Sequence, residues 1–176
     1  MSEKWDVRDI AAANFNTFVD ARTQKRRFAD YAAFLGVPLL LGVGTALLRQ
    51  WGHFHLYDVS KFIGGIGVFT GLLFGLLTNV FTLSLRLQRD DDLADHDVAL
   101  NVRELFANVS WAVAVGLTLV VLLVVTGSIH DPKKPLDSIW TGVLVSFFSH
   151  LILIVLMSLK RIWLAHASIS RLPPKG

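Results

Sequence analysis

His150 is the ionisable side chain that falls deepest inside a charge-free stretch of this 176-residue sequence. Gly142, Ser146 and His150 recur every four residues, so they share one face of a helix, and Ser149 is adjacent. An ionisable group is costly in hydrocarbon unless it faces water or a hydrogen-bond partner. Two roles follow for His150. It lines a pore or senses protons, or it is a neutral imidazole bonded to Ser146, Asn79 or a backbone carbonyl.

A row of glycines forms a second pattern that could act in the membrane. Gly67, Gly71 and Gly75 recur every four residues and Asn79 continues the row, which predicts a bare groove followed by an amide. Because lipid competes with protein for apolar contact, small residues that let backbones approach favour a helix neighbour. That neighbour is either a second subunit or the first apolar stretch of the same chain. The first stretch offers three small residues, Ala32, Gly36 and Gly44.

The acidic run 90–97 is the other cluster that could do chemistry. It holds aspartates and His96, but no second histidine stands at a ligand spacing and the chain has no cysteine. A solvated helix end is therefore favoured over a divalent-cation site or a partner contact. The sequence also lacks a Gly-x-Ser-x-Gly elbow, a His-Glu-x-x-His pair and a phosphate-binding glycine loop. We predict no catalytic residue, no metal site, no cofactor and no enzymatic activity.

Four long apolar stretches must position these residues. The chain is 53% hydrophobic, and about 20 consecutive apolar residues cross a hydrocarbon core of ~30 Å. The predicted transmembrane helices cover residues 31–48, 62–85, 107–129 and 138–159. The sequence therefore predicts an all-α, polytopic integral membrane protein with a single domain in the lipid bilayer.

The polar segments between and before these stretches are also expected to be helical. The arm 1–30 predicts an amphipathic helix over 6–29, and the central loop 86–104 predicts helical extensions of the second and third spans. The arm ends in a basic cluster of the kind that docks on anionic headgroups. That cluster is Lys25, Arg26 and Arg27. The arm and the central loop are also the segments through which a cytosolic protein partner would bind.

Basic residues are distributed unevenly around the spans. Thirteen of the 17 lysines and arginines lie in the arm, the central loop and the tail 160–176, and four lie in the loops 49–61 and 131–137. The positive-inside rule then places both termini in the cytoplasm, with Trp111 at the inner interface of the plasma (inner) membrane. The net charge is +3, but the basic residues flank apolar runs, so nucleic acid is not an expected partner.

The middle of the chain resembles a group of known membrane proteins. The likeness rests on the run 70–77 (Thr-Gly-Leu-Leu-Phe-Gly-Leu-Leu), the polar exit at Arg86 and the segment 103–111 (Arg-Glu-Leu-Phe-Ala-Asn-Val-Ser-Trp). These features are similar to small four-span membrane proteins that accompany bacterial anti-phage and prophage loci. The likeness covers residues 62–125 and contains no catalytic motif. It implies an oligomeric effector that disturbs the inner membrane when activated, although this chain carries no appended soluble sensor domain.

Three classes of function remain open from the sequence. The leading hypothesis is a self-associating, non-enzymatic protein that forms a pore or depolarises the membrane, because four packed helices leave no lumen and a pore would need several copies. The second is a membrane anchor or immunity-type protein that holds a cytosolic or toxin partner. The third is a small transporter subunit, which usually has discontinuous helices or buried charge pairs that this sequence does not show.

Overall fold

The computed structural model describes residues 8–16, 32–89 and 96–169, and its regular elements in those ranges are helices. In chain order they are α1 (Arg8–Asn16), the π-helical turn η2 (Ala32–Gly36), α3 (Val37–Gln50), α4 (Ser60–Arg89), α5 (His96–Ile129) and α6 (Ser138–Ile169). Four segments are long and apolar enough to cross a membrane: η2 with α3, and then α4, α5 and α6. The predicted all-α, four-span membrane protein is confirmed.

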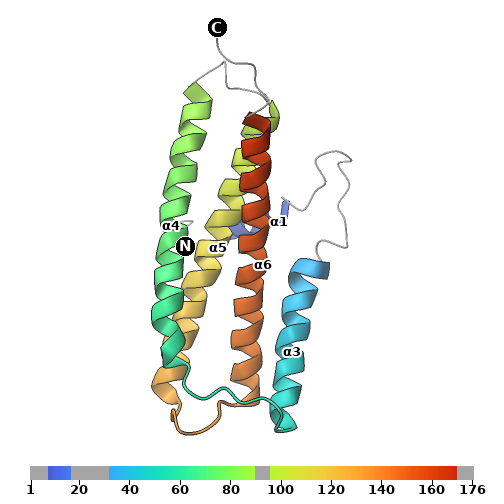
Figure 1. The fold of residues 1–176 in the computed structure, drawn as a ribbon, viewed down its shortest axis with the longest axis vertical. Helices are drawn as coiled ribbons and strands as arrows, with labels where there is room; N and C mark the ends of the chain where they lie inside the picture. The colour runs from blue at the N-terminus through green and yellow to red at the C-terminus, as the bar shows by residue number, and fades with distance from the viewer. Residues whose placement is uncertain (1–7, 17–31, 90–95, 170–176) are drawn as a thin grey trace.

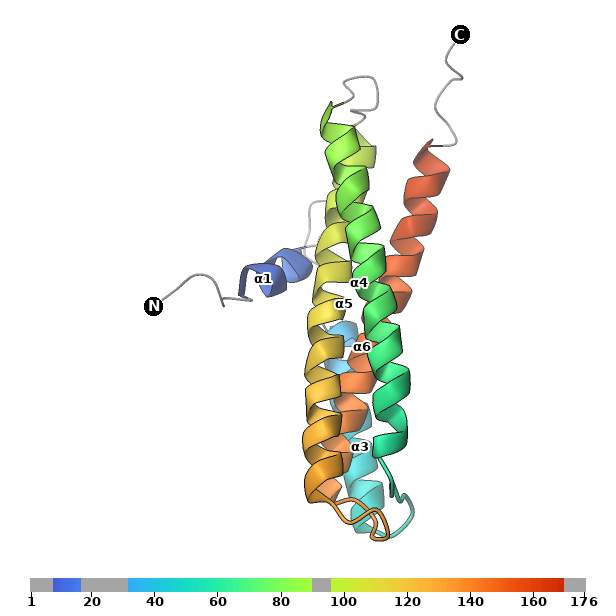
Figure 2. The same ribbon diagram turned by 90° about the vertical axis from the view of Figure 1, so that its left-hand side faces the viewer.

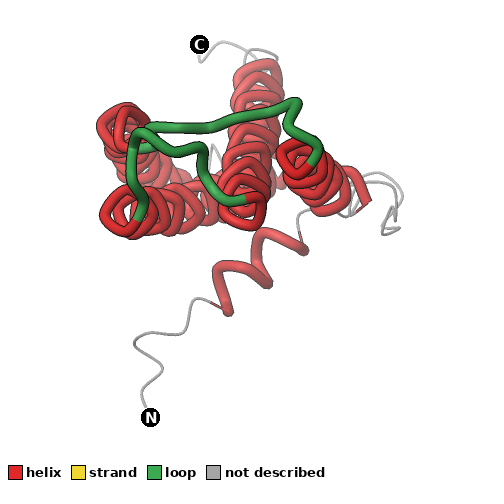
Figure 3. The backbone as a smooth tube through the Cα atoms, turned by 90° about the horizontal axis from the view of Figure 1, so that it is seen from below, coloured by secondary structure: helices red, strands yellow, loops and turns green. Residues whose placement is uncertain are grey.

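The four spans stand in an open row instead of a closed bundle. α4 packs on α5, α5 on α6, and α6 on α3. α3 and α4 follow one another in the chain but lie at opposite edges of the row (Figure 1). The loop 51–59 joins them by passing along the lower end of the molecule, as the view from below shows (Figure 3). The row therefore has two edge helices, and each leaves much of its surface uncovered by the chain.

Burial differs strongly between the centre and the edges of the row. In the most apolar window of each span, 39% of the residues are buried for α5 but only 11% for η2 and α3. The core between α5 and α6 includes Leu119, Leu151 and Ile154, all nearly inaccessible. By contrast, Leu40 of α3 is 73% exposed. Such apolar surface is stable only against lipid, which agrees with a membrane location.

Helix ends outside the apolar windows match the predicted extensions. α4 continues to Arg89 and α5 begins at His96, so both helices project beyond the predicted spans. α6 continues to Ile169, through most of the segment that the sequence left as a tail. In the described part of the arm, a helix covers Arg8–Asn16, within the predicted stretch 6–29.

Several sequence predictions fall outside the described residues. The remainder of the arm, 17–31, is one such segment, and most of the acidic run, 90–95, is another. The predicted membrane-surface cluster lies in the first of them: Lys25, Arg26 and Arg27.

Leu136 joins the two loops at the lower end of the molecule. Its backbone N–H donates to the Leu56 carbonyl at 2.6 Å, and its carbonyl accepts a hydrogen bond from Arg49 Nε at 2.9 Å. The Leu136 side chain is only 1% exposed. These contacts tie the end of α3 to the start of α6.

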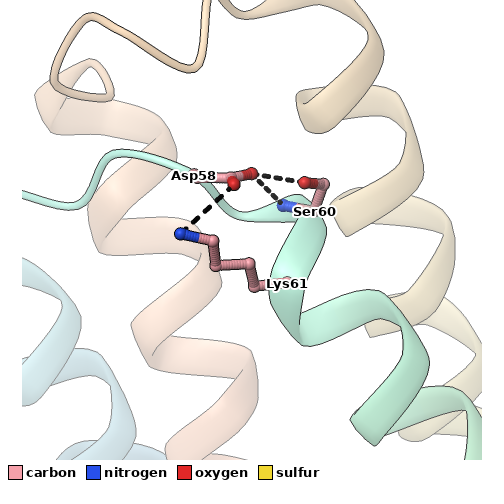
Figure 4. A network of polar contacts seen from close by, with 3 residues as sticks. All are labelled: Asp58, Ser60 and Lys61. Carbon is pink, nitrogen blue, oxygen red and sulfur yellow. Dashed lines mark hydrogen bonds and ion pairs between the residues drawn. The ribbon is translucent and has the colours of Figure 1, made fainter.

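Asp58 caps the beginning of α4 (Figure 4). Its Oδ1 accepts hydrogen bonds from the hydroxyl and, at 3.2 Å, from the backbone N–H of Ser60, and its Oδ2 lies 3.5 Å from Lys61 Nζ. The bond from the Ser60 hydroxyl is the main reason that the pKa of Asp58 lies below its ordinary value of 3.8, and Lys61 lowers it further. The carboxylate thus serves as a helix cap at the loop end of α4.

Candidate functional site: a histidine joint between three spans

His150 uses both ring nitrogens in bonds to other elements. Its Nε2 lies 3.2 Å from Trp111 Nε1, which donates, and its Nδ1 lies 3.1 Å from the Phe34 carbonyl oxygen, which accepts. A carbonyl can only accept and an indole N–H can only donate, so this pattern fits a neutral imidazole protonated at Nδ1. We call this arrangement of His150, Trp111 and the Phe34 carbonyl the His150 joint. It ties α6 to α5 and to η2.

Pro38 explains why the Phe34 carbonyl turns to a side chain. In a regular α-helix this carbonyl would accept a bond from the N–H four residues later, and proline has no N–H. Phe34 stands four residues before Pro38, and the π-helical turn η2 covers the same stretch. The imidazole N–H of His150 supplies the donor that the proline lacks. The sequence left three partners open for His150, namely Ser146, Asn79 and a backbone carbonyl. The structure shows the third, the carbonyl of Phe34.

α3 and α6 touch through their backbones closer to the lower loops. A Cβ built on Gly42 would lie 2.6 Å from the Gly142 carbonyl oxygen, and one built on Gly142 would lie 2.8 Å from that of Gly42. Ser146 is also in this contact, since its Cβ would be 2.9 Å from a Cβ on Gly42. The predicted row Gly142, Ser146 and His150 is therefore the face of α6 that seats α3. Ser149 is half-buried beside it.

Helix α1 reaches the same site from the other side of α5. Figure 2 shows α1 lying against α5 and running across the spans instead of parallel to them. Asn14 Nδ2 donates to Asn108 Oδ1 at 2.9 Å, and the two residues are 1% and 0% exposed. The Phe15 and Trp111 rings lie with their centroids 6.2 Å apart. Trp111 thus contacts both α1 and His150.

An ion pair joins α5 to α6 towards the upper end of the molecule. Arg161 Nη1 donates to Glu104 Oε2, and both side chains are mostly buried. This pair and the His150 joint are the described polar side-chain links between α5 and α6. Among the described residues, no group of three or more His, Asp or Glu side chains could hold a metal ion.

The glycine row of α4 has no neighbour among the described residues. A Cβ built on Gly67, Gly71 or Gly75 would meet nothing within 4 Å, and Asn79 is exposed on the same face. α4 packs on α5 through its other side, where Thr70 occupies the space that a Cβ on Gly116 would need. Asn79 therefore does not take part in the His150 joint.

The intrachain neighbour considered for the glycine row is wrong. The first span packs on α6, at the far edge of the row from α4. Gly36 and Gly44, two of the small residues offered for that contact, have nothing within 4 Å of a built Cβ. The small residue that the first span does use is Gly42, because it meets Gly142.

Sequence reasoning missed several residues of this site. Trp111 was expected only as an interface tryptophan, and Asn14 and Asn108 were not considered at all. One signal was present: a proline inside a span leaves the carbonyl four residues earlier without its usual donor, which points to Phe34. Asn14 and Asn108 gave no such signal, since their pairing depends on where α1 crosses α5.

These features define the class of protein. It is an all-helical, multi-pass membrane protein in which one imidazole ties the first span to the two helices at the centre of the row. Comparisons with protein-family models, with curated proteins and with solved structures find no match for this chain.

Proposed function

We propose that this protein is a non-enzymatic effector that self-associates in the plasma (inner) membrane, with both termini in the cytoplasm, and opens a pore or depolarises the membrane. One observation carries the proposal. The row Gly67, Gly71, Gly75 and Asn79 lies on an edge helix and faces away from the rest of the chain. A face of this composition packs closely against another helix in a bilayer, and the described part of the chain places no helix there.

Asn79 is the reason to expect protein on this face instead of lipid. The neighbouring hydroxyls of Thr78 and Thr82 bond to carbonyls of their own helix, at 3.1 and 3.0 Å. The Asn79 amide makes no hydrogen bond to another described residue. An amide both donates and accepts, and copies inserted in the same direction bring it to the same depth. Two Asn79 side chains can therefore satisfy one another across a symmetric contact.

A conducting path is expected between copies and not within one. The spans of a single copy form a row with free edges, and the two ring nitrogens of His150 are both used in packing. The threonines and Asn79 give the outer face of α4 a polar strip that a neighbouring copy can share. The resemblance of residues 62–125 to membrane proteins of anti-phage loci supports a role in bacterial antiviral defence.

The mass of the detergent-solubilised particle tests the proposal. We expect a homo-oligomer for the natural sequence and a single copy for Gly71→Leu, because the added side chain separates the two backbones. Gly65→Leu is the matched control. It adds the same side chain to the same helix, at a glycine with nothing within 4 Å of its Cβ, but about 200° around the helix from Gly67.

Two results would contradict self-association through this face. One is a natural sequence that runs as a single copy. The other is a Gly71→Leu protein whose particle mass equals that of Gly65→Leu. Membrane potential measured during expression tests the depolarising activity separately. We expect it to fall with the natural sequence and to be maintained with Gly71→Leu.

A membrane anchor is the second candidate, favoured by the contact of α1 with α5. A groove of ≈ 430 Å³ lies between these helices and is lined by both charged and apolar residues. Its lining includes Asp9, Ile10, Arg103, Glu104 and Phe106. These residues belong to the segments 1–30 and 86–104 proposed for a cytosolic partner. An anchor is expected to be harmless when overproduced, whereas a depolarising effector stops growth.

A further inference from the structure

The first span packs on one neighbouring helix among the described residues, α6. Only 11% of its apolar window is buried. Its polar and close backbone contacts occur at three places: the Phe34 carbonyl on His150, Gly42 on Gly142, and Arg49 on Leu136. Loss of the first of these removes the hydrogen bond between His150 and the upper end of the span. A change in the His150 joint is therefore expected to loosen that end first.

Helix α1 is attached specifically but weakly. It has nine residues, and the described element that it packs on is α5. The buried bond between Asn14 and Asn108 fixes its register, because two amides meet at one point only. A net amide hydrogen bond contributes little to stability, since water can satisfy both groups after separation. The contact thus suits a helix that docks and undocks.

Trp111 links the two attachments. On one side its ring lies against Phe15 of α1, and on the other its N–H bonds to His150. His150 in turn bonds to the Phe34 carbonyl of the first span. The series of contacts from α1 to the first span is therefore continuous, although no contact between α1 and α3 is needed for it.

We propose that α1 is a latch for the first span. Docked on α5, α1 holds Trp111 where it bonds His150, and His150 then seats the first span on α6. When α1 leaves α5, the tryptophan is freed and the upper end of the first span loosens. Coupling of this kind is reciprocal, so loosening the joint must also release α1. The inference holds for a single copy and does not depend on self-association.

The reciprocal effect gives a direct experiment, because the natural chain has no cysteine. Ile10 is half-buried in the groove between α1 and α5, so Ile10→Cys provides one thiol that is protected while α1 is docked. Its labelling rate with a water-soluble maleimide is measured in the purified full-length protein. We expect Trp111→Phe and His150→Leu to raise this rate about fivefold or more. Trp111→Phe keeps an aromatic ring but removes the N–H donor and part of the indole, whereas His150→Leu leaves the ring contact between Trp111 and Phe15 in place.

Three further variants make the result decisive. Ala12→Cys, exposed on α1, gives the rate of an unprotected thiol, and Asn108→Leu in the Ile10→Cys background gives the rate when α1 is released directly. Arg49→Met loosens the first span at its lower end and should leave the rate unchanged. Equal rates for Ile10→Cys and Ala12→Cys would overturn the proposal, since α1 would then not be docked. So would an unchanged rate in Trp111→Phe, or an equal rise in Arg49→Met.

Discussion

The contact face of α6 and the outer face of α4 carry the same kind of sequence but have different surroundings. Each presents small residues at four-residue spacing and ends in a polar side chain, His150 on α6 and Asn79 on α4. The backbone of α3 contacts the α6 row, whereas the glycines of the α4 row meet no other described residue. Small-residue spacing thus indicates that a backbone can approach. It does not indicate which helix approaches.

The polar residue at the end of each row shows how complete the contact is. His150 has partners at both ring nitrogens within the chain. Asn79 has an amide with no bond to another described residue. An unpaired amide is costly in hydrocarbon. The α4 row therefore has the composition of a helix–helix contact but lacks, among the described residues, the neighbouring helix that the α6 row has.

Gly142→Leu is expected to have the largest effect. Any Cβ at this position would lie 2.8 Å from the Gly42 carbonyl oxygen, so α3 must move away from α6. Overpacking of this kind costs about 3 kcal/mol of unfolding free energy. Reversible unfolding in mixed detergent measures the loss, with Gly65→Leu as the control that adds leucine in open space. Equal stability of the two variants would show that the backbone contact is absent.

His150→Leu is expected to cost about 1–3 kcal/mol, because the Phe34 carbonyl loses its donor and the Trp111 N–H loses its acceptor. The same unfolding assay gives this value. Dye leakage from vesicles, expressed per folded molecule, separates the packing role from a pore-lining role. Unchanged leakage in the variant supports packing. Reduced leakage with normal folded yield would instead assign His150 to a pore.

Asn79→Leu is expected to weaken association by about 0.6 kcal/mol while leaving the fold of one copy unchanged. The reason is that Asn79 is exposed and makes no hydrogen bond to another described residue. The dissociation constant in detergent, measured by sedimentation, reports the change. Asn79→Gln keeps an amide and serves as the control. Tighter association of the leucine variant would mean that the amide opposes the contact.

Acidification is expected to have the smallest effect, at the loop end of α4. The pKa of Asp58 is lowered in the folded protein, so its stabilising contribution is complete above the ordinary value of 3.8 and is lost as the pH falls through the lower, folded value. Asp58→Asn should remove this dependence. Amide exchange at the first turn of α4 between pH 5 and pH 3 measures it. A natural protein that responds no more than the variant would contradict the capping role.

The sequence contained enough information for the spans but not for their order. Charge-free length and basic flanks identified all four helices, and the apolar pattern of the central loop predicted the extensions to Arg89 and from His96. Periodicity assigns a face to each helix and says nothing about its neighbour. The loop 51–59 is long enough to carry α4 to the far edge of the row, so the first span does not become the neighbour of the glycine row, which was one of its two predicted partners.

For the candidate site, too, the sequence predicted the helix face but not the neighbouring helices. The spacing of Gly142, Ser146 and His150 correctly placed these residues on one helix face. Their partners Gly42 and Trp111 come from helices whose position only the tertiary structure defines.

We expect the effects of substitutions at Pro38 and His150 to depend on each other, although 112 positions separate the two residues in the chain. Pro38→Ala restores a backbone N–H that can reach the Phe34 carbonyl. This carbonyl then no longer needs the imidazole as its donor, and the Trp111 N–H is the remaining group that uses His150. His150→Leu should therefore be tolerated better in a Pro38→Ala background than in the natural one. Among related sequences, a span that has lost the proline is the place to look for a relaxed requirement at position 150.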